Sequence, residues 1–272
     1  MAVAAGFHSP HVRAARLLHT KKHRAEARCF LIEGPALIEA ALGNDIIPSA
    51  VFCLSEARPE SAACVELAQQ AGVPVYAVDE RTLESLAQTR TPQGVVAQVG
   101  FIDRDVAALH KLVPPQGAAV VLVLDDLDDP GNAGTLVRSA EAFGVSAVCF
   151  GPASVEPYND KLVRASMGAL FRVPIVRYAA WSELAGALGK GELSVMGASA
   201  TGPDIRSVEL PQRSALVLGN ERHGLRAVPA DAFAMVVGIP QRPAGESLNV
   251  AVAGSIVLYE LARCGLRLST ER

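Results

Sequence analysis

The chain has 272 residues, of which 50% are hydrophobic and 19% charged, and a formal net charge of −3. This composition supports one large core or two modest ones and excludes disorder as the main state. Every apolar run is shorter than the roughly 18 to 20 residues of a membrane span, so no membrane partner is expected. The N-terminal residues show no secretion signal, and the cysteines form no C-x-x-C pair. We therefore expect free thiols, no metal site and a cytoplasmic location.

Positive charge is concentrated near the N-terminus. Residues 8–28 hold six Lys or Arg side chains and four of the six histidines, opposed only by Glu26. Such a segment is typical either of a solvated helix face or of a contact with nucleic-acid phosphates. From this segment alone, both interpretations stay open.

The first hundred residues alternate between helix and strand patterns. Helices are predicted at 35–42, 61–72 and 80–88, and strands at 50–54, 73–78 and 94–101. We therefore expect a small α/β domain over residues 1–100. A helix-like segment at 103–112 then runs into two prolines and a glycine, which disfavour regular structure. Residues 101–117 are the predicted linker.

Stronger strand patterns begin at residue 118. Residues 118–127 form a continuous apolar run, typical of a central parallel strand covered on both faces. Further strands are predicted at 146–150, 172–178, 192–199, 214–220 and 234–239, and helices at 132–144, 159–170, 181–189 and 247–265. Residues 118–272 are thus predicted to form an open parallel α/β sheet that binds its ligand at the carboxyl ends of the strands.

Several common chemistries lack their motifs. The loop after the first strand of this domain, residues 129–134, does not carry G-x-G-x-x-G, which argues against a dinucleotide site. Residues 219–224 have the glycine spacing of a P-loop, but Leu225 and Arg226 replace its Lys-Ser/Thr pair. No zinc-protease or serine-hydrolase motif occurs.

Two loops that follow predicted strands carry polar residues. In residues 129–138, Asn132 is predicted to cap the next helix and Arg138 to face a ligand, although an ordinary exposed arginine would fit the same pattern. In residues 216–225, an apolar strand ends in a glycine-bounded loop that carries Glu221. Glycine there permits close approach of a ligand to the backbone.

A third loop, residues 239–250, leads from a strand into the last helix. Ser247 is predicted to cap this helix, and a role as a mere cap would explain it. Asn249 is not a favoured residue inside a first helical turn, which suggests a further role. The residues that follow are small enough for close packing: Ala251, Ala253, Gly254 and Ser255.

Three segments, in this order, resemble the three motifs of the SpoU (TrmH) family of RNA ribose 2′-O-methyltransferases. They are the segment from Asn132 to Arg138, the Gly219-Asn220-Glu221 loop, and the segment from Ile239-Pro240 to Ser247-Leu248-Asn249-Val250. This resemblance spans residues 118–267. Residues 8–42 and 91–97 resemble the family's N-terminal substrate-binding domain, which is similar to a small ribosomal RNA-binding protein. One departure is Gln241-Arg242, where many members have methionine after Ile-Pro. We expect it to change cofactor affinity at most.

The resemblance implies a SPOUT-type trefoil knot in the C-terminal domain, a homodimer whose sites use both subunits, S-adenosylmethionine as cofactor and RNA as partner. The implied cofactor residues are Ser199, Leu218, Gly219, Ile239 and Leu248. The implied catalytic residues are Asn132, Arg138, Glu221, Ser247 and Asn249. RNA contacts are predicted for Arg13, Lys21, Lys22, Arg24 and Arg164.

In this family the residue at Arg138 is assigned to activation of the ribose 2′-hydroxyl. A general base would have to be a neutral guanidinium, which is costly because the solution pKa of arginine exceeds about 12. We favour a charged Arg138 that holds the target phosphate and stabilises a developing alkoxide, but both roles stay open.

The extra N-terminal domain favours ribosomal RNA as the substrate, because family members that act on tRNA often carry short extensions instead. A tRNA 2′-O-methyltransferase and a non-catalytic RNA-binding or ribosome-assembly module remain alternatives. The intact Arg138, Glu221, Ser247 and Asn249 favour an enzyme. The sequence identifies neither the target nucleotide nor a housekeeping or antibiotic-resistance role.

Overall fold

A computed structural model describes residues 2–56, 58–242 and 247–265. Its contacts divide the chain into two compact units. The first unit comprises Met1–Ile102 and Tyr158–Phe171, and the second unit comprises Asp103–Pro157 and Arg172–Arg272. Within the described ranges, no helix combines the length and the apolar character needed to cross a bilayer.

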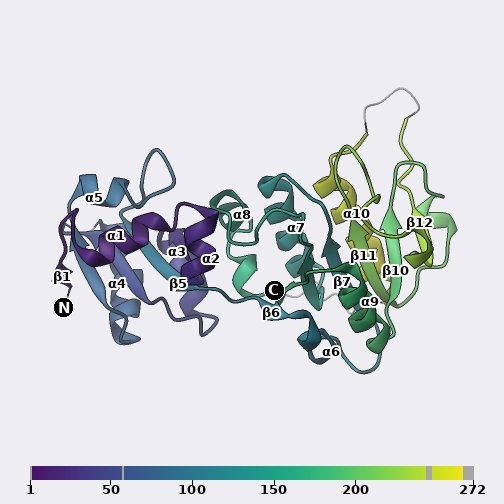
Figure 1. Cartoon of the computed structure of the whole chain (residues 1–272), viewed down its shortest axis with the longest axis horizontal. Helices are drawn as coiled ribbons and strands as arrows, with labels where there is room; N and C mark the ends of the chain where they lie inside the picture. The colour runs from purple at the N-terminus through teal and green to yellow at the C-terminus, as the bar shows by residue number, and fades with distance from the viewer. Residues whose placement is uncertain (1, 57, 243–246, 266–272) are drawn as a thin grey trace. The chain divides into compact units, whose positions relative to one another are not determined.

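The first unit, most of which is drawn in purple and blue in Figure 1, is built on a five-stranded mixed sheet in the order β1-β4-β3-β5-β2. Its strands are β1 (Val3–Ala4), β2 (Cys29–Glu33), β3 (Ala50–Leu54), β4 (Val75–Val78) and β5 (Val95–Gly100). β5 runs antiparallel to both β2 and β3, and the other pairs are parallel. Its helices are α1 (Pro10–Leu17), α2 (Lys21–Ala27), α3 (Pro35–Leu42), α4 (Pro59–Gln70), α5 (Glu80–Glu84), α8 (Asp160–Ala165) and the 3-10 turn η2 (Ala169–Phe171).

The second unit contains a seven-stranded sheet in the order β12-β10-β11-β7-β8-β9-β6, and every strand pair in it is parallel. This confirms the predicted open parallel α/β sheet. The strands are β6 (Arg104–Asp105), β7 (Ala119–Leu124), β8 (Ala147–Phe150), β9 (Ile175–Arg177), β10 (Ser194–Ala198), β11 (Arg213–Leu218) and β12 (Met235–Val237). The helices are α6 (Leu109–Leu112), α7 (Pro130–Ala142), α9 (Trp181–Lys190) and α10 (Val250–Gly265), with 3-10 turns η1 (Val106–Ala108), η3 (Ile205–Ser207) and η4 (Ala230–Ala232).

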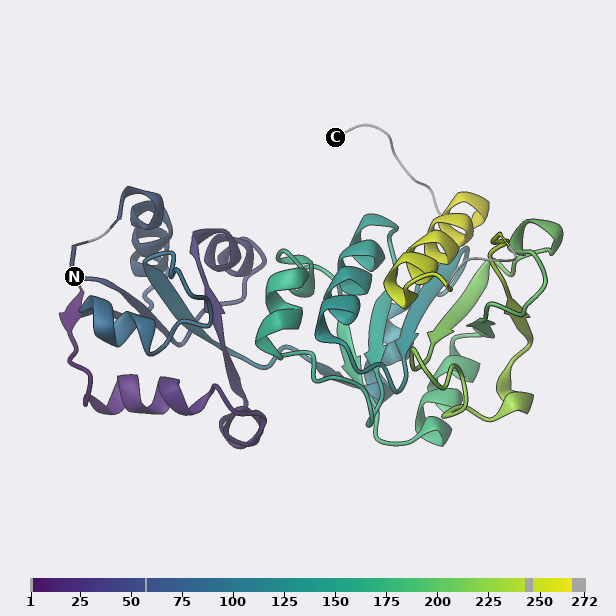
Figure 2. The same ribbon diagram turned by 90° about the horizontal axis from the view of Figure 1, so that it is seen from above.

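Strand β7 lies at the centre of this sheet, and all six of its residues are buried. Helices α7 and α10 lie side by side over one face (Figure 2). On the other face, Val121 and Val123 belong to a core cluster with Leu109 of α6 and with Leu184 and Leu188 of α9. Burial on both faces explains why β7 is apolar throughout.

Two segments differ from the predicted domain boundaries. The predicted linker contributes β6, which pairs with β9, and its Leu109 and Val113 are buried in the core of the second unit. Residues 158–171 pack with the first unit, where the ring of Tyr158 stacks on Phe101 with 4.0 Å between centroids. Neither contact is local in sequence, so local patterns cannot reveal it.

The helix predicted over 159–170 is also shorter than expected. It ends at Ala165, and Met167 and Gly168 then adopt left-handed φ values of 50° and 82°. Two consecutive residues in that region cannot continue a right-handed helix. The chain resumes as the short turn η2.

Candidate active site

Helix α7 begins at the carboxyl edge of the sheet, a few residues after the end of β7. Its N-cap is Asp129, whose Oδ1 accepts a hydrogen bond of 2.8 Å from the backbone N–H of Asn132. Asn132 was predicted as the cap and instead lies in the first turn. Its side chain is therefore free to bond elsewhere.

Helix α10 is capped by Asn249. Its Oδ1 accepts from the backbone N–H groups of Ala251, at 2.8 Å, and Val252, at 3.3 Å. The prediction that Ser247 caps this helix is wrong, because the helix starts later, at Val250. The cap explains the asparagine that seemed out of place in a first turn.

Three predicted catalytic residues form one chain of hydrogen bonds. Nδ2 of Asn249 donates to Oδ1 of Asn132 across 2.9 Å, and Nδ2 of Asn132 donates to Oε1 of Glu221, also across 2.9 Å. Each asparagine amide is thereby held in one orientation. The carboxylate retains acceptor capacity for a ligand hydroxyl.

A cavity of about 760 Å³ opens at the carboxyl ends of β10, β11 and β12. All five predicted cofactor residues line it: Ser199, Leu218, Gly219, Ile239 and Leu248. Ser247, Glu221 and Asn249 line it as well. The role of each residue in binding stays a prediction.

S-adenosylmethionine fits this cavity by size and by chemistry. The volume of the cavity lies within the range of cofactor sites, and its wall combines apolar side chains, such as Ile239 and Leu248, with polar ones, such as Glu221. Gly219 is required at one point, because a Cβ there would lie 2.1 Å from the carbonyl oxygen of Gly224. Leu248, 37% exposed, offers an apolar surface to a ligand.

Gln241 has a role at this cavity that the sequence did not suggest. Its Oε1 accepts a hydrogen bond of 3.1 Å from the backbone N–H of Leu248. The side chain that replaces the family's usual methionine thus holds Leu248, one of the predicted cofactor residues. No local pattern signals this bond, which spans seven positions.

A second cavity of about 610 Å³ shares the turn at Glu221 with the first. Its wall is polar: Asp128, Asp129, Asn132, Asn220, Glu221, Arg222, His223 and Asn249. Arg222 and His223 are exposed and line both cavities, and the sequence-based hypotheses did not include them. Such a wall suits a polar ligand rather than an apolar one.

Arg138 lies apart from this group. It is exposed on α7 and is not among the described residues that line either cavity. One chain therefore does not bring Arg138 together with Asn132, Glu221 and Asn249.

Beneath the site, at the end of β7, the buried carboxyl of Asp125 accepts a hydrogen bond of 2.7 Å from the hydroxyl of Tyr178. Burial raises the pKa of Asp125, and the bond from Tyr178 acts in the opposite direction. Burial and the neighbouring carboxyl raise the pKa of Tyr178 far above its ordinary value. Across the residues with assigned positions, no group of three or more His, Cys, Asp or Glu side chains could hold a metal ion.

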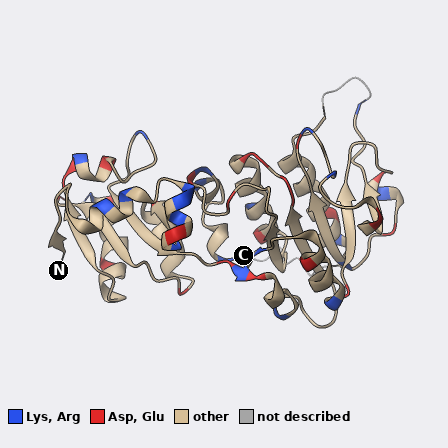
Figure 3. Cartoon of the chain, in the orientation of Figure 1, with Lys and Arg blue, Asp and Glu red and all other residues tan. Residues whose placement is uncertain are grey.

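In the first unit, Lys and Arg residues occur along α1 and α2 (Figure 3). Arg13, Lys21 and Lys22 are exposed, as an RNA contact requires. Arg24 is only 5% exposed, and its guanidinium donates to the carbonyl oxygens of Leu18 and His19, both at 3.0 Å. Arg24 is thus the least accessible of the cations predicted to contact RNA, and its guanidinium holds the turn between α1 and α2.

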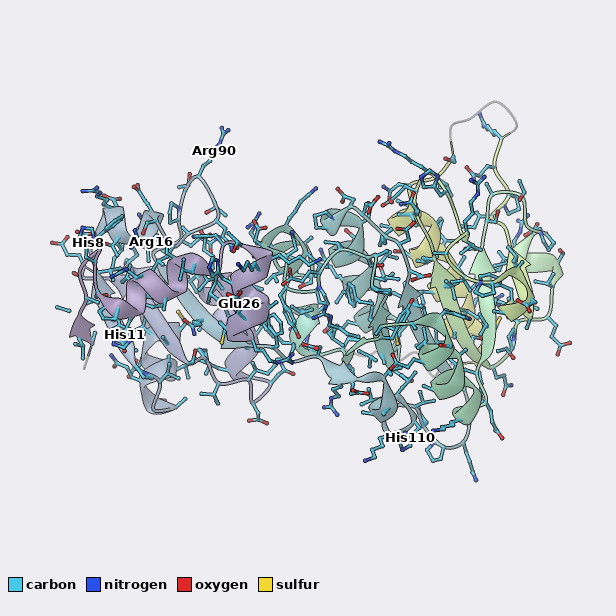
Figure 4. All side chains as sticks on the ribbon, viewed as in Figure 1. His8, His11, Arg16, Glu26, Arg90 and His110 are labelled. Carbon is cyan, nitrogen blue, oxygen red and sulfur yellow. The ribbon has the colours of Figure 1, made fainter. Side chains whose placement is uncertain are left out.

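Arg164 belongs to α8 of the first unit and pairs with Asp160 at 3.0 Å. Another cation of this unit, Arg90, projects from the loop before β5 (Figure 4). That loop is fastened by the buried carboxylate of Glu33, which accepts from the N–H groups of Gln88 and Thr89. Nothing in the local sequence distinguishes Arg90 from an ordinary loop residue.

Comparison with known proteins agrees with this geometry. Residues 119–259 match the SpoU rRNA Methylase family, and residues 9–97 match the MRM3-like substrate binding domain. A relative from Bacillus subtilis, 23S rRNA (guanosine(2553)-2′-O)-methyltransferase RlmP, is 32% identical over 92% of this chain and 95% of its own. The 23S rRNA (guanosine-2′-O-)-methyltransferase RlmB of Coxiella burnetii is 32% identical over 73% of this chain and 80% of its own.

Solved structures show the same architecture. An AdoMet-bound rRNA methyltransferase from Sinorhizobium meliloti superposes with a TM-score of 0.83 at 28% identity, covering 97% of each chain. The SpoU methyltransferase AviRb from Streptomyces viridochromogenes, in complex with AdoMet, gives 0.84 at 25% identity, covering 94% of this chain and 97% of that one. The chain is thus an S-adenosylmethionine-dependent RNA methyltransferase. It belongs to the SpoU rRNA methylase family.

Proposed function

We propose that this protein transfers a methyl group from S-adenosylmethionine to a ribose 2′-hydroxyl of ribosomal RNA. The observation that carries the proposal is the chain Asn249–Asn132–Glu221, which lies beside a cavity of cofactor size. The similarity to RlmP and RlmB, both named as 23S rRNA 2′-O-methyltransferases, supports ribosomal RNA over tRNA.

The cofactor, when bound, supplies a methyl group on a positively charged sulfur. The backbone around Leu218 and Gly219, together with Ile239 and Leu248, would hold it, and Ser199 would close one side. Glu221 would accept a hydrogen bond from the target ribose, and Asn132 would donate one to it. Together they would fix the position of the ribose hydroxyl. Ser247, exposed at the same cavity, is a further candidate for the ribose. Alignment of this kind can supply a large part of the rate enhancement.

Arg138 would act from the second subunit of a homodimer. Its position outside both cavities in one chain supports this arrangement. On α10, Val252 and Tyr259 are 47% and 46% exposed, which leaves an apolar surface beside α7 for a partner subunit. A charged guanidinium there would hold the target phosphate and stabilise the negative charge that develops on the 2′-oxygen as the hydroxyl proton passes to water.

The knot implied by the family also belongs to the proposal. Support comes from the close crossing of the segments around Gly202 and Gly238. The backbone N–H of Ile205 donates to the carbonyl oxygen of Gly238 at 2.9 Å, and the backbone N–H of Gly238 donates to the carbonyl oxygen of Pro203 at 2.7 Å. A Cβ at Gly202 would lie 2.5 Å from the backbone of Val237. A crystal structure that traces residues 238–250 tests the threading.

In the proposed complex, Arg13, Lys21 and Lys22 of the first unit capture RNA, with Arg164 as a further phosphate contact. A ribosomal RNA substrate supports a cytoplasmic location for the enzyme. Exposure of the three α1 and α2 cations supports this role.

The test uses the full chain, S-adenosylmethionine with a labelled methyl group, and RNA from cells that lack the gene. We expect label at a 2′-O position of ribosomal RNA. Label confined to tRNA would support the tRNA alternative, and binding of RNA and cofactor without label would support a non-catalytic module. Mixed dimers test the shared site: Arg138→Ala and Glu221→Ala, each inactive alone, should regain activity when combined.

A further inference from the structure

Asn220 is a buried polar residue at the start of the turn that carries Glu221. It is 7% exposed, and its side chain makes four hydrogen bonds. Nδ2 donates to the carbonyl of Asp126 and to Oδ2 of Asp128, both at 3.0 Å. Oδ1 accepts from the backbone N–H groups of Arg222 at 2.9 Å and His223 at 3.1 Å. These four bonds use the whole capacity of the amide.

The two ends of this amide do different work. Oδ1 acts within the turn, which is also closed by reciprocal backbone bonds between Asn220 and Gly224 at 2.8 and 3.0 Å. Nδ2 acts between segments, because Asp126 and Asp128 follow β7 whereas Asn220 follows β11. The turn can therefore form without Nδ2, but the two side-chain bonds to the segment after β7 cannot.

The same two segments are joined a second time by the bond from Asn132 to Glu221. Both of these side chains are accessible to water, so that bond alone contributes little to holding the segments together. The link through Asn220 is partly buried, because Asn220 is only 7% exposed, and it is therefore the stronger constraint. Its position therefore sets where Glu221 meets Asn132.

We propose that Asn220, together with Asp128, is a positioning residue for the methyl transfer. It fixes the turn so that the Glu221 carboxylate is already oriented by Asn132 before RNA binds. Asn220 acts through Glu221 and does not touch the reacting atoms. The inference rests on the proposed function, in which Glu221 orients the target ribose.

Asn220→Asp separates the two roles. The new carboxylate keeps the Oδ1 acceptor of the turn, but it places negative charge against Asp128 and the carbonyl of Asp126. At saturating cofactor and RNA, we expect kcat to fall about 10- to 100-fold, the scale of a small misplacement of reacting groups. Adding Asp128→Asn should recover most of this loss, because the new amide can donate to the carboxylate at 220.

A double-mutant cycle shows whether Asn220 acts through Glu221. In a Glu221→Gln background, Asn220→Asp should lower kcat less than threefold further. The control is Arg213→Ala, which removes hydrogen bonds to the carbonyls of Pro114, Gly117 and Gly191 at the opposite end of β11. It should lower the melting temperature and leave kcat unchanged.

If Asn220→Asp does not fold, Asp128→Ala tests the same link from an exposed position, with an expected loss of about 3- to 10-fold in kcat. Hydrogen exchange adds a readout independent of activity: Asp128→Ala should speed exchange in both 126–132 and 219–224. Multiplicative losses in the cycle, or no rescue by Asp128→Asn in a folded protein, would overturn the inference while leaving the proposed function intact. If the wild-type protein shows no 2′-O-methylation activity, the proposed function is overturned. If hydrogen exchange in 126–132 and 219–224 is unchanged in Asp128→Ala, the link between Asn220 and the segment after β7 is overturned.

Discussion

Asn249 Nδ2 lies 2.9 Å from Asn132 Oδ1, although 117 positions separate the two residues in the chain. The same Asn249 uses its Oδ1 to cap α10, so its side chain is held at both ends. One residue thereby couples the start of the last helix to the first turn of α7. The orientation of Asn132 is consequently fixed from one side by Asn249 and from the other by Glu221.

Asn132→Asp tests this coupling. The aspartate would retain an acceptor for Asn249 but would replace the donor to Glu221 with a second negative charge, so that the two carboxylates repel each other. We expect kcat/KM to fall at least about 100-fold in an RNA methylation assay. S-adenosylmethionine affinity, measured by calorimetry, should change less than threefold, because Asn132 does not line the larger cavity.

The matched variant is Thr135→Ala, one turn further along α7 on an exposed position whose hydroxyl bonds only to the carbonyl of Gly131 among the described residues. It should retain most of the activity. Equal losses in the two variants would mean that the helix, rather than the hydrogen-bond chain, matters.

Gln241 gives a prediction for cofactor binding. Gln241→Ala removes the acceptor of the Leu248 N–H, and one such bond is worth about 1 kcal/mol. We expect the Kd for S-adenosylmethionine to rise about fivefold in calorimetry, with RNA affinity unchanged. Arg242→Ala, at the next exposed position, is the control. A Kd that stays constant in Gln241→Ala would show that the wall at Leu248 does not depend on this bond.

Strong apolar patterns made the second unit predictable. The continuous run of β7 could only be a strand covered on both faces, and the loops after β7, β11 and β12 followed from it. The first unit was harder, because α1, α2 and β2 are short. The stability of the two helices comes from caps such as Ser9 and Thr20 and from tertiary contacts, rather than from a long periodic pattern of apolar residues.

Side-chain partners that depend on how the chain turns between elements could not be predicted. The basic character of Arg24 indicated a phosphate contact, yet the fold directs it to two carbonyls at the end of α1. The helices are capped by Asp129 and Asn249, whereas the local pattern predicted Asn132 and Ser247 as the caps. Which residue caps a helix depends on where the helix starts, and tertiary packing can shift that start by a few residues.

The buried pair Asp125 and Tyr178 predicts a pH dependence of stability. Because burial raises the pKa of Asp125, its contribution to the free energy of unfolding is greatest at acid pH and declines as pH rises through the folded-state pKa. Tyr178→Phe removes the bond that favours the charged carboxylate. We expect a loss of about 1 to 3 kcal/mol in urea unfolding near neutral pH, and a smaller loss at acid pH, below the folded-state pKa of Asp125.

Tyr76→Phe is the comparison, since the hydroxyl of Tyr76 has no hydrogen bond to the described part of the chain. Its stability change should be small and independent of pH. A loss in Tyr178→Phe that is equal at both pH values would show that Asp125 is not the group responsible.

The last prediction concerns RNA capture by the first unit. Arg13, Lys21 and Lys22 are exposed, and each phosphate contact that is lost should reduce the slope of log K against log salt by about 0.7 to 0.9. The triple alanine variant should therefore bind RNA more weakly, with a slope lower by about 2 to 3.

Because the net charge alone could have this effect, the control removes three exposed cations of the second unit: Lys111, Arg177 and Lys190. Filter binding at several salt concentrations should leave the slope of that control close to the wild-type value. Arg24→Ala should instead lower the melting temperature, because its guanidinium holds the turn between α1 and α2. An unaltered slope in the first triple variant would assign α1 and α2 to a solvated surface and move RNA capture elsewhere on the protein.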